Sequence, residues 1–158
     1  MSETWHARRA VRADARALTE VYLRSFRAAL PTVTLAHPDH EVAEWMRDVV
    51  VGERDTWTVE RDGEPVALLS LDPPADDGPT FLNHLYLAPE SRGLGIGDAI
   101  MALAKAERPG GLQLWAFQVN APARRFYARH GFREVELTDG LSNEEREPDV
   151  RIVWLPTV

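Results

Sequence analysis

The chain has 158 residues and is 44% hydrophobic, which is enough for a single globular domain, 1–158, with its own core. Its net charge of −7 argues against a general nucleic-acid binder, because such proteins hold the phosphate backbone with clustered Lys and Arg. The absence of cysteine excludes a disulfide framework, a thiolate nucleophile and a Cys-based zinc site, and we expect no metal. The sequence lacks an apolar run long enough to cross a bilayer, and its N-terminus lacks the apolar part of a secretion signal. We therefore expect a cytoplasmic protein without a membrane partner.

The first third of the chain predicts one strand followed by two helices. Residues 5–11 have a weak strand pattern. Apolar residues at helical spacing predict a helix over 15–29, with Asp14 as its N-cap and Pro31 beyond its end. A second helix is predicted over 40–50, with Asp39 as its cap and Gly52 as its stop signal.

The middle of the chain predicts a hairpin and one more strand. From Thr56 the apolar residues change to strand spacing, and the pair Asp62-Gly63 between two such runs is a strong turn signal. A loop rich in Pro and Asp, 72–79, then leads to a strand over 80–88.

The C-terminal part predicts helices that alternate with strands. An amphipathic helix ends before Pro109-Gly110-Gly111, and the nearly continuous apolar run 112–119 predicts a strand that is buried on both faces. Pro122 suits the first turn of a helix over 121–130. Strands at 132–137 and 150–155 enclose a polar, acidic loop. The order of these elements predicts a mixed α/β domain.

A glycine-rich loop, 91–97, opens the helix of the C-terminal part. Glycine at every second position, Gly93, Gly95 and Gly97, removes the side chains that would keep a ligand from the main chain. The free amides and the positive end of the helix dipole converge there, which suits a phosphate or diphosphate. A nucleoside-triphosphate loop would need Lys and then Ser or Thr where this chain has Asp98-Ala99, and the dinucleotide fingerprint fails because its last glycine is missing.

The pattern Arg-x-x-Gly-x-Gly, at Arg92, Gly95 and Gly97 after a strand, resembles the acyl-CoA-binding motif of the GCN5-related N-acetyltransferases, the GNAT superfamily. The resemblance implies a single-domain GNAT-type α/β fold: a mostly antiparallel, twisted sheet of about seven strands, splayed at the acyl-CoA site and flanked by about four helices. It implies acetyl-CoA as cosubstrate. The diphosphate would lie on the main chain of these residues: Arg92, Gly93, Leu94, Gly95, Ile96 and Gly97.

A second segment, 120–132, begins where an apolar strand ends and a helix starts, which is where open α/β sheets hold ligands. By resemblance, Asn120 lies near the pantetheine arm of the coenzyme and Tyr127 near its thioester sulfur, with Ala123 and Phe126 as further contacts. A phenol is protonated at neutral pH, so Tyr127 is suited to give a proton to the departing thiolate. The alternative for Phe126 and Tyr127 is an aromatic pair that only packs the helix on the sheet.

The family also splays the strand before the motif from its neighbour, which would free main-chain groups of Leu85, Tyr86 and Leu87 to bond the pantetheine amides. An amide at Leu87 is then expected to stabilise the negative charge that develops on the acetyl oxygen. The alternative is a fully paired central strand.

The base that deprotonates the acceptor amine is predicted to be His84, beside the motif, because its ordinary pKa is close to neutral. A water chain, or a histidine with a structural role, is the alternative. Acceptor specificity is expected in the loops, at 31–41 and around Asn143, Glu144, Glu145 and Asp149, where an ammonium group would find partners.

These observations predict an acetyl-CoA-dependent N-acetyltransferase that moves the acetyl group directly to a primary amine of a small molecule, and a homodimer is compatible with them. Three alternatives stay open at this point. They are a protein N-terminal or lysine acetyltransferase, a non-catalytic acyl-CoA sensor or partner-binding module on the same fold, and a dinucleotide-binding oxidoreductase domain.

Overall fold

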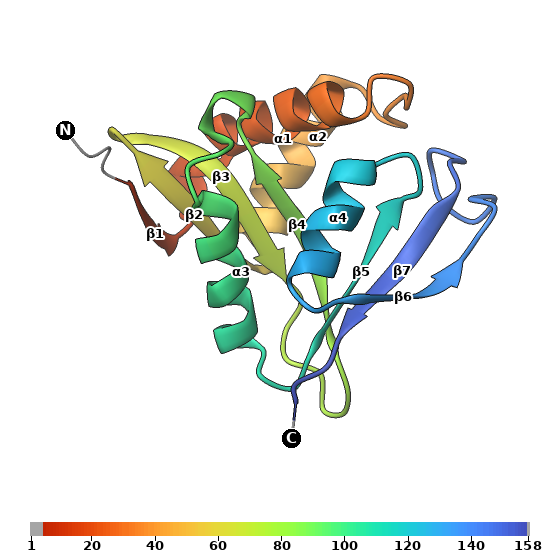
Figure 1. The fold of residues 1–158 in the computed structure, drawn as a ribbon. Helices are drawn as coiled ribbons and strands as arrows, with labels where there is room; N and C mark the ends of the chain where they lie inside the picture. The colour runs from red at the N-terminus through yellow and green to blue at the C-terminus, as the bar shows by residue number, and fades with distance from the viewer. Residues whose placement is uncertain (1–4, 158) are drawn as a thin grey trace.

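The computed structural model describes residues 5–157, which form one seven-stranded sheet with helices on both faces (Figure 1). The strand order is β1-β2-β3-β4-β5-β7-β6. All neighbours are antiparallel except β4 and β5, so the mixed α/β fold and the mostly antiparallel sheet are confirmed. The strands are β1 (Trp5–Arg9), β2 (Asp55–Arg61), β3 (Glu64–Leu71), β4 (Thr80–Leu87), β5 (Leu112–Phe117), β6 (Arg133–Leu137) and β7 (Asp149–Trp154). The α-helices are α1 (Ala15–Ala29), α2 (Asp39–Trp45), α3 (Ile96–Glu107) and α4 (Ala121–Arg129).

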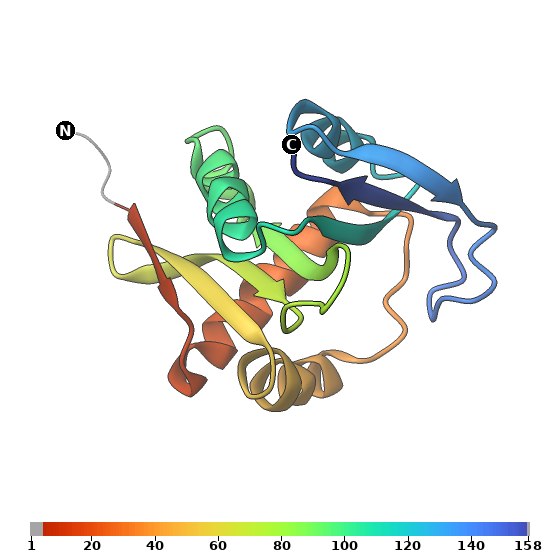
Figure 2. The ribbon, with the colours of Figure 1, turned by 90° about the horizontal axis from the view of Figure 1, so that it is seen from below.

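The helices are divided between the two faces of the sheet. Figure 2 shows α3 and α4 on one face and α1 and α2 on the other. The core under α3 and α4 includes Ile100, Met101 and Leu112, whereas the core under α1 and α2 includes Leu18 and Met46. Each helix presents one apolar stripe to the sheet, so its polar face is left for solvent.

The strands β4 and β5 separate soon after they begin. They pair in parallel only at Thr80 with Leu112 and at Phe81 with Gln113, and Figure 1 shows them diverging beyond that point, with α4 in front of the opening. The side of β4 that faces β5 therefore lacks a ladder partner over most of its length. This is the predicted splay, and it excludes a fully paired central strand.

The predicted hairpin is confirmed between β2 and β3. Asp62 and Gly63 both have positive φ, 53° and 82°, as the tightest hairpin turns require.

Asp14 occupies the N-cap position of α1, as predicted, but its side chain makes no capping hydrogen bond to that helix. Asp14 ends a short 3₁₀ turn, Arg12–Asp14, and its carboxylate accepts bonds from the Val11 amide at 2.8 Å and from the Arg8 guanidinium at 2.8 and 2.9 Å. Two charge-assisted hydrogen bonds from Arg8 of β1 are stronger than one bond to a main-chain amide of α1, so the Asp14 carboxylate binds the arginine. The prediction that Asp39 caps α2 is wrong, because Asp39 is the first residue of that helix and follows its N-cap, Pro38.

The second helix continues past α2 in a wider form. Residues Met46–Val51 form a π-helical turn that ends at Gly52. A Cβ at Gly52 would lie 2.4 Å from the Asp48 carbonyl oxygen, so only glycine fits there. The stop signal at Gly52 is therefore confirmed.

The strand β5 is shorter and less buried than predicted. It ends at Phe117, and Trp115 is 43% exposed, so the prediction of burial on both faces over 112–119 is wrong. The reason is tertiary. Helix α1 packs over β3 and β4, and because β5 diverges from β4, α1 reaches this face of β5 at Phe117, whose ring centroid lies 6.3 Å from that of Phe26, and leaves Trp115 exposed.

Within residues 5–157, none of the helices is both long and apolar enough to cross a membrane.

The Arg8–Asp14 pair gives a stability prediction. The Arg8 guanidinium holds the pKa of the Asp14 carboxyl below its usual range. Because the folded-state pKa lies below the unfolded value of about 3.9, the stabilisation is present above that pH and is lost as pH falls through the lowered pKa. We expect Asp14→Asn to lower the free energy of unfolding at pH 7 by about 2 kcal/mol, and the difference from the wild type to shrink in acid. Urea unfolding at pH 7 and at lower pH measures it.

The matched control is Asp48→Asn. Asp48 also pairs with arginines, Arg47 at 2.8 Å and Arg12 at 3.2 Å, but all three side chains are exposed. Solvent screens such pairs, so the control should unfold like the wild type. An equal loss in both variants would contradict the special role of Asp14.

Candidate functional site

The glycine-rich loop between β4 and α3 has the backbone that its sequence predicts. Gly93 and Gly95 have φ of 79° and 83°, a left-handed conformation that favours glycine. A Cβ built on either residue meets nothing within 4 Å, so both backbones border open space. Gly97 differs, because a Cβ there would lie 3.2 Å from Cε1 of Phe126. Its glycine lets α4 pack closely on the first turn of α3.

The first turn of α3 presents unbonded amides beside these glycines. Ala99 is the first residue whose amide bonds back along the helix, to the Gly95 carbonyl at 3.1 Å. The amides of Ile96, Gly97 and Asp98 precede it and have no acceptor within the helix. Together with the helix dipole they favour an anion at this place.

A cavity of about 450 Å³ lies in front of this loop, between α1, β4, α3 and α4. The structure brings most of the predicted cofactor residues together on its walls: Leu85, Tyr86, Leu87, Arg92, Gly93, Gly95, Gly97, Asn120, Ala123, Phe126 and Tyr127. Two predicted residues are not among them. Leu94 is 38% exposed, and the Ile96 side chain is fully buried in the core, so at most their main chains face the loop.

Sequence reasoning missed several residues of this cavity. Ser25, Ala28 and Ala29 form its wall on α1, and their spacing of three and four residues with small side chains was a usable signal. Asp98 and Arg129 form the rim, and their ion pair at 2.9 Å joins α3 to α4. The pairing also lowers the pKa of Asp98, which stays ionised with its charge compensated.

Asn120 and Tyr127 lie at the inner end of this cavity. Asn120 caps α4, since its Oδ1 accepts a bond from the Ala123 amide at 3.2 Å. The Tyr127 ring is 7% exposed and makes edge contacts with Phe126 and Phe132, each with ring centroids 5.3 Å apart. Burial raises the pKa of the Tyr127 phenol, so the phenol is protonated throughout the neutral range. The ring therefore packs the core and also presents a neutral proton donor.

A second cavity of about 220 Å³, here called the junction cavity, adjoins the first where β4 and β5 separate. The two cavities share Leu85, Tyr86, Asn120, Ala123 and Tyr127. A third cavity of about 720 Å³, here called the acceptor cavity, lies between α1, α2 and the loop 138–148. It shares Asn83, His84 and Glu145 with the junction cavity. The three cavities thus form a series across the sheet, with Tyr127 on one side of the junction and His84 on the other.

His84 is placed among aromatic rings rather than beside a carboxylate. Its ring makes edge contacts with Trp45 and Tyr22, at 5.0 and 5.8 Å between centroids. Arg54 Nη1 donates to His84 Nε2 at 3.3 Å, which leaves the ring proton on Nδ1. Nδ1 is buried without a hydrogen-bond partner among the described residues. Burial and the Arg54 charge lower the pKa of His84 to about 3, so its imidazole is a weak proton acceptor.

The acceptor cavity has an acidic wall. Five carboxylate residues line it, from α2, the π-helical turn and the loop 138–148: Glu41, Glu44, Asp48, Glu144 and Glu145. His37 Nε2 lies 2.5 Å from Glu144 Oε2, which ties the segment between α1 and α2 to the loop 138–148. Two loops predicted to govern the acceptor therefore do lie side by side. Residues 5–157 contain no group of three or more His, Cys, Asp or Glu side chains placed to hold a metal ion.

A splayed α/β sheet, an anion loop at a helix start and a buried phenol beside it are the features expected of an acyl-CoA-dependent acyltransferase. Comparison with known proteins agrees. The model of the acetyltransferase (GNAT) domain family matches residues 52–134. The peptidyl-lysine N-acetyltransferase YiaC of Escherichia coli (strain K12) is 30% identical over 135 residues, which cover 82% of this chain and 84% of YiaC. The chain therefore belongs to the GNAT acetyltransferase family, and it is an N-acetyltransferase with acetyl-CoA as its acyl donor.

Solved structures share the fold at lower sequence identity. The apo form of YjaB from Escherichia coli has a TM-score of 0.77 and 19% identity, over 98% of this chain and 99% of that one. PaiA N-acetyltransferase from Thermoplasma acidophilum, solved with coenzyme A, has a TM-score of 0.76 and 19% identity, over 96% and 99%.

Proposed function

We propose that the chain transfers an acetyl group from acetyl-CoA directly to the primary amine of a small cationic molecule. The series of three cavities carries this proposal. The coenzyme enters through the 450 Å³ cavity and the amine through the acceptor cavity, and the two meet in the junction cavity beside Tyr127. Direct transfer is consistent with a chain that has no cysteine to form an acyl-enzyme.

The groups that line the first cavity match the diphosphate and the pantetheine arm of the coenzyme. The Gly93 and Gly95 backbones and the unbonded amides of the first turn of α3 would hold the diphosphate, with Arg92 adding a positive charge. The unladdered edge of β4, at Leu85, Tyr86 and Leu87, would bond the pantetheine amides as an added strand does. A main-chain donor at Leu87 aimed at the acetyl oxygen would be worth about 3 kcal/mol in the transition state.

Tyr127 is the acid of the proposed reaction. Expulsion of the thiolate needs a proton, and the phenol lines both the coenzyme cavity and the junction cavity. A module that only senses acyl-CoA would not need this phenol at the junction.

The acceptor cavity supports a small cationic substrate. Its volume of about 720 Å³ lies within the usual range for small-molecule sites, and its carboxylates favour an ammonium group. A protein lysine is the second candidate, because the relative YiaC is named a peptidyl-lysine N-acetyltransferase. A cytoplasmic location and a homodimer stay predictions.

A panel of amines tests the proposal. Acetyl-CoA is mixed with small diamines, amino acids, lysine-containing peptides and neutral amines, and free CoA is measured. We expect saturable release with small cationic amines. If CoA is released only with the lysine-containing peptides, the substrate is a protein lysine and not a small molecule. Binding of CoA by calorimetry without turnover on any amine would favour the sensor, and no binding of CoA or acetyl-CoA would overturn the site.

A further inference from the structure

The loop 138–148 places one carboxylate, Glu145, where the acceptor cavity meets the junction cavity. Glu145 lines both cavities, whereas Glu144 lines the acceptor cavity alone. Asp149 is the other carboxylate of the junction cavity, but its oxygens are occupied by bonds from the Thr138 hydroxyl and, at 3.1 Å, from Asn143 Nδ2. Within residues 5–157, Glu145 has neither an ion pair nor a hydrogen bond from another side chain. It is therefore the carboxylate at the junction that is free to meet a substrate.

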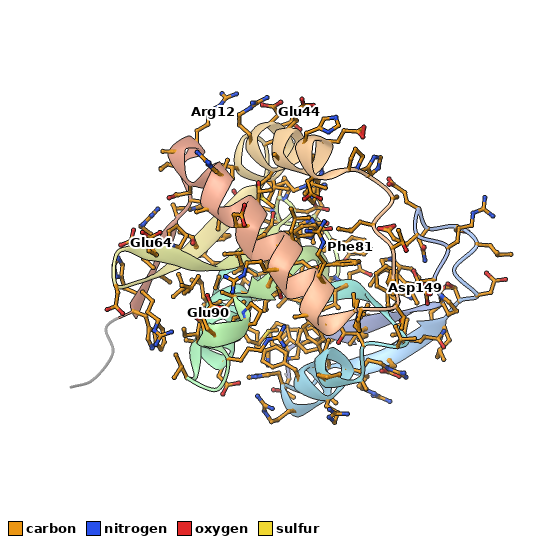
Figure 3. All side chains as sticks on the ribbon, turned by 90° about the horizontal axis from the view of Figure 1, so that it is seen from above. Arg12, Glu44, Glu64, Phe81, Glu90 and Asp149 are labelled. Carbon is orange, nitrogen blue, oxygen red and sulfur yellow. The ribbon has the colours of Figure 1, made fainter. Side chains whose placement is uncertain are left out.

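The loop holds Glu145 in a defined place. Asn143 Nδ2 donates to the Glu147 carbonyl at 2.7 Å, and the Glu147 amide donates to Asn143 Oδ1 at 3.2 Å, so the two bonds close a ring of backbone around Glu145. Gly140 packs closely against the main chain of Glu147 and Pro148. A Cβ there would lie 2.1 Å from the Glu147 carbonyl oxygen, and its φ is 81°, so only glycine fits. Figure 3 shows Asp149 at the base of this loop, on the side where the segment between α1 and α2 passes.

The surroundings of Glu145 suit a proton acceptor. Burial and the neighbouring Glu144 raise the pKa of Glu145, while its own amide and His37 act in the opposite direction. A raised pKa makes a carboxylate a better base, and it stays ionised at neutral pH unless the shift is several units. The Glu145 charge also contributes to the raised pKa values of Tyr22, to about 12, and of Tyr86, so its field reaches the rings that line the site. The other titratable or charged groups of the two cavities are His37, Glu41, Glu44, Asp48, Arg54, His84, Tyr127, Glu144 and Asp149.

We propose that Glu145 is the catalytic base that deprotonates the acceptor ammonium at the junction cavity; this rests on the proposed function. The Glu145 carboxylate takes one proton from the ammonium, and the nitrogen lone pair forms the new C–N bond to the acetyl carbon. The C–S bond breaks with its electron pair on sulfur, which takes the proton of the Tyr127 phenol. The second proton leaves the nitrogen to restore the phenol, and Glu145 releases its own proton to solvent. Glu145 and Tyr127 thus act from opposite ends of one small cavity.

The experiment compares pH profiles of kcat/KM for the wild type, Glu145→Gln, Glu147→Gln and His84→Gln. Glu147 is on the same loop and lines none of the three cavities, so Glu147→Gln should keep the wild-type profile. We expect Glu145→Gln to lower kcat/KM at pH 7 by about 10²- to 10⁴-fold and to recover as rising pH deprotonates the free amine. In His84→Gln, kcat/KM should rise with pH over the same range as in the wild type. Wild-type rates in Glu145→Gln at all pH values, or loss of this rise in His84→Gln alone, would overturn the assignment.

A second measurement separates this inference from the proposed function. NMR titration of the side-chain carboxyl carbons, without any coenzyme or amine, should show one glutamate above its ordinary pKa whose signal is lost in Glu145→Gln. An unshifted Glu145 overturns the inference even if the enzyme is active. A wild type that binds CoA but acetylates none of the amines overturns the proposed function and the base together, whatever the titration shows.

Discussion

Replacing Tyr127 by phenylalanine lowers kcat by about 10²- to 10⁴-fold, the range for loss of a positioned acid. The ring should keep its place, because its contacts with Phe126 and Phe132 involve only ring carbons. The affinity for CoA and the midpoint of thermal unfolding should therefore stay close to those of the wild type. Steady-state assays of released thiol measure the loss of kcat, and calorimetric titration with CoA measures the unchanged affinity.

Tyr22→Phe is the matched comparison. Tyr22 is another buried tyrosine, but it lines the acceptor cavity and not the junction. Because Tyr22 lines only the acceptor cavity among the three, this variant should change KM for the amine more than kcat. Undiminished turnover in Tyr127→Phe at every pH would remove the phenol from the mechanism.

Gly95→Ala is the second large expected effect. The alanine Cβ would project into the open space where the diphosphate is proposed to lie, and the residue would also be strained at φ 83°. Loss of one hydrogen bond to a charged group costs about 1.5–3 kcal/mol, which corresponds to a Kd for CoA weaker by about tenfold to a hundredfold. Calorimetric titration with CoA measures it.

Gly63→Ala separates the strain from the blocked site. Gly63 lies in the β2–β3 turn with φ of 82°, and a Cβ there also meets nothing within 4 Å. Both variants should lose about 1–2 kcal/mol of stability from the left-handed backbone, whereas only Gly95→Ala should lose CoA affinity. If both bind CoA like the wild type, the diphosphate does not lie at Gly95.

Much of the fold and of the coenzyme cavity could be predicted because the signals are local. Asp62-Gly63 specifies a turn through its own backbone preferences, and the alternation of Gly93, Gly95 and Gly97 at a helix start is readable without any partner. Gly97 lines the coenzyme cavity too, but its small size also serves the packing of Phe126, which the local signal did not indicate. A sequence shows where a glycine stands, but only the tertiary structure shows which neighbouring element requires the small residue there.

Sequence-based predictions were wrong or incomplete where contacts with a distant segment determine the environment of a side chain. Asp14 has the residue type of a helix cap, yet it binds Arg8 of the neighbouring strand. Trp115 belongs to an apolar run, yet the splay moves it away from the helix that would cover it. The role of His84 as a base stays a prediction, and its tertiary surroundings disfavour it, because burial and the charge of Arg54 lower its pKa to about 3.

The sequence by itself determined the anion loop, the phenol on α4 and the family resemblance, because spacing along the chain sets backbone conformation and the face of a helix. Only the tertiary structure decided how the cavities follow one another and which carboxylate at the junction has no side-chain partner among the described residues. Glu145 lies 61 residues beyond His84 in the chain, and the two line the same cavities because the loop 138–148 is anchored opposite α2. Contacts between distant segments depend on the packing of the whole sheet, so local preferences do not specify them.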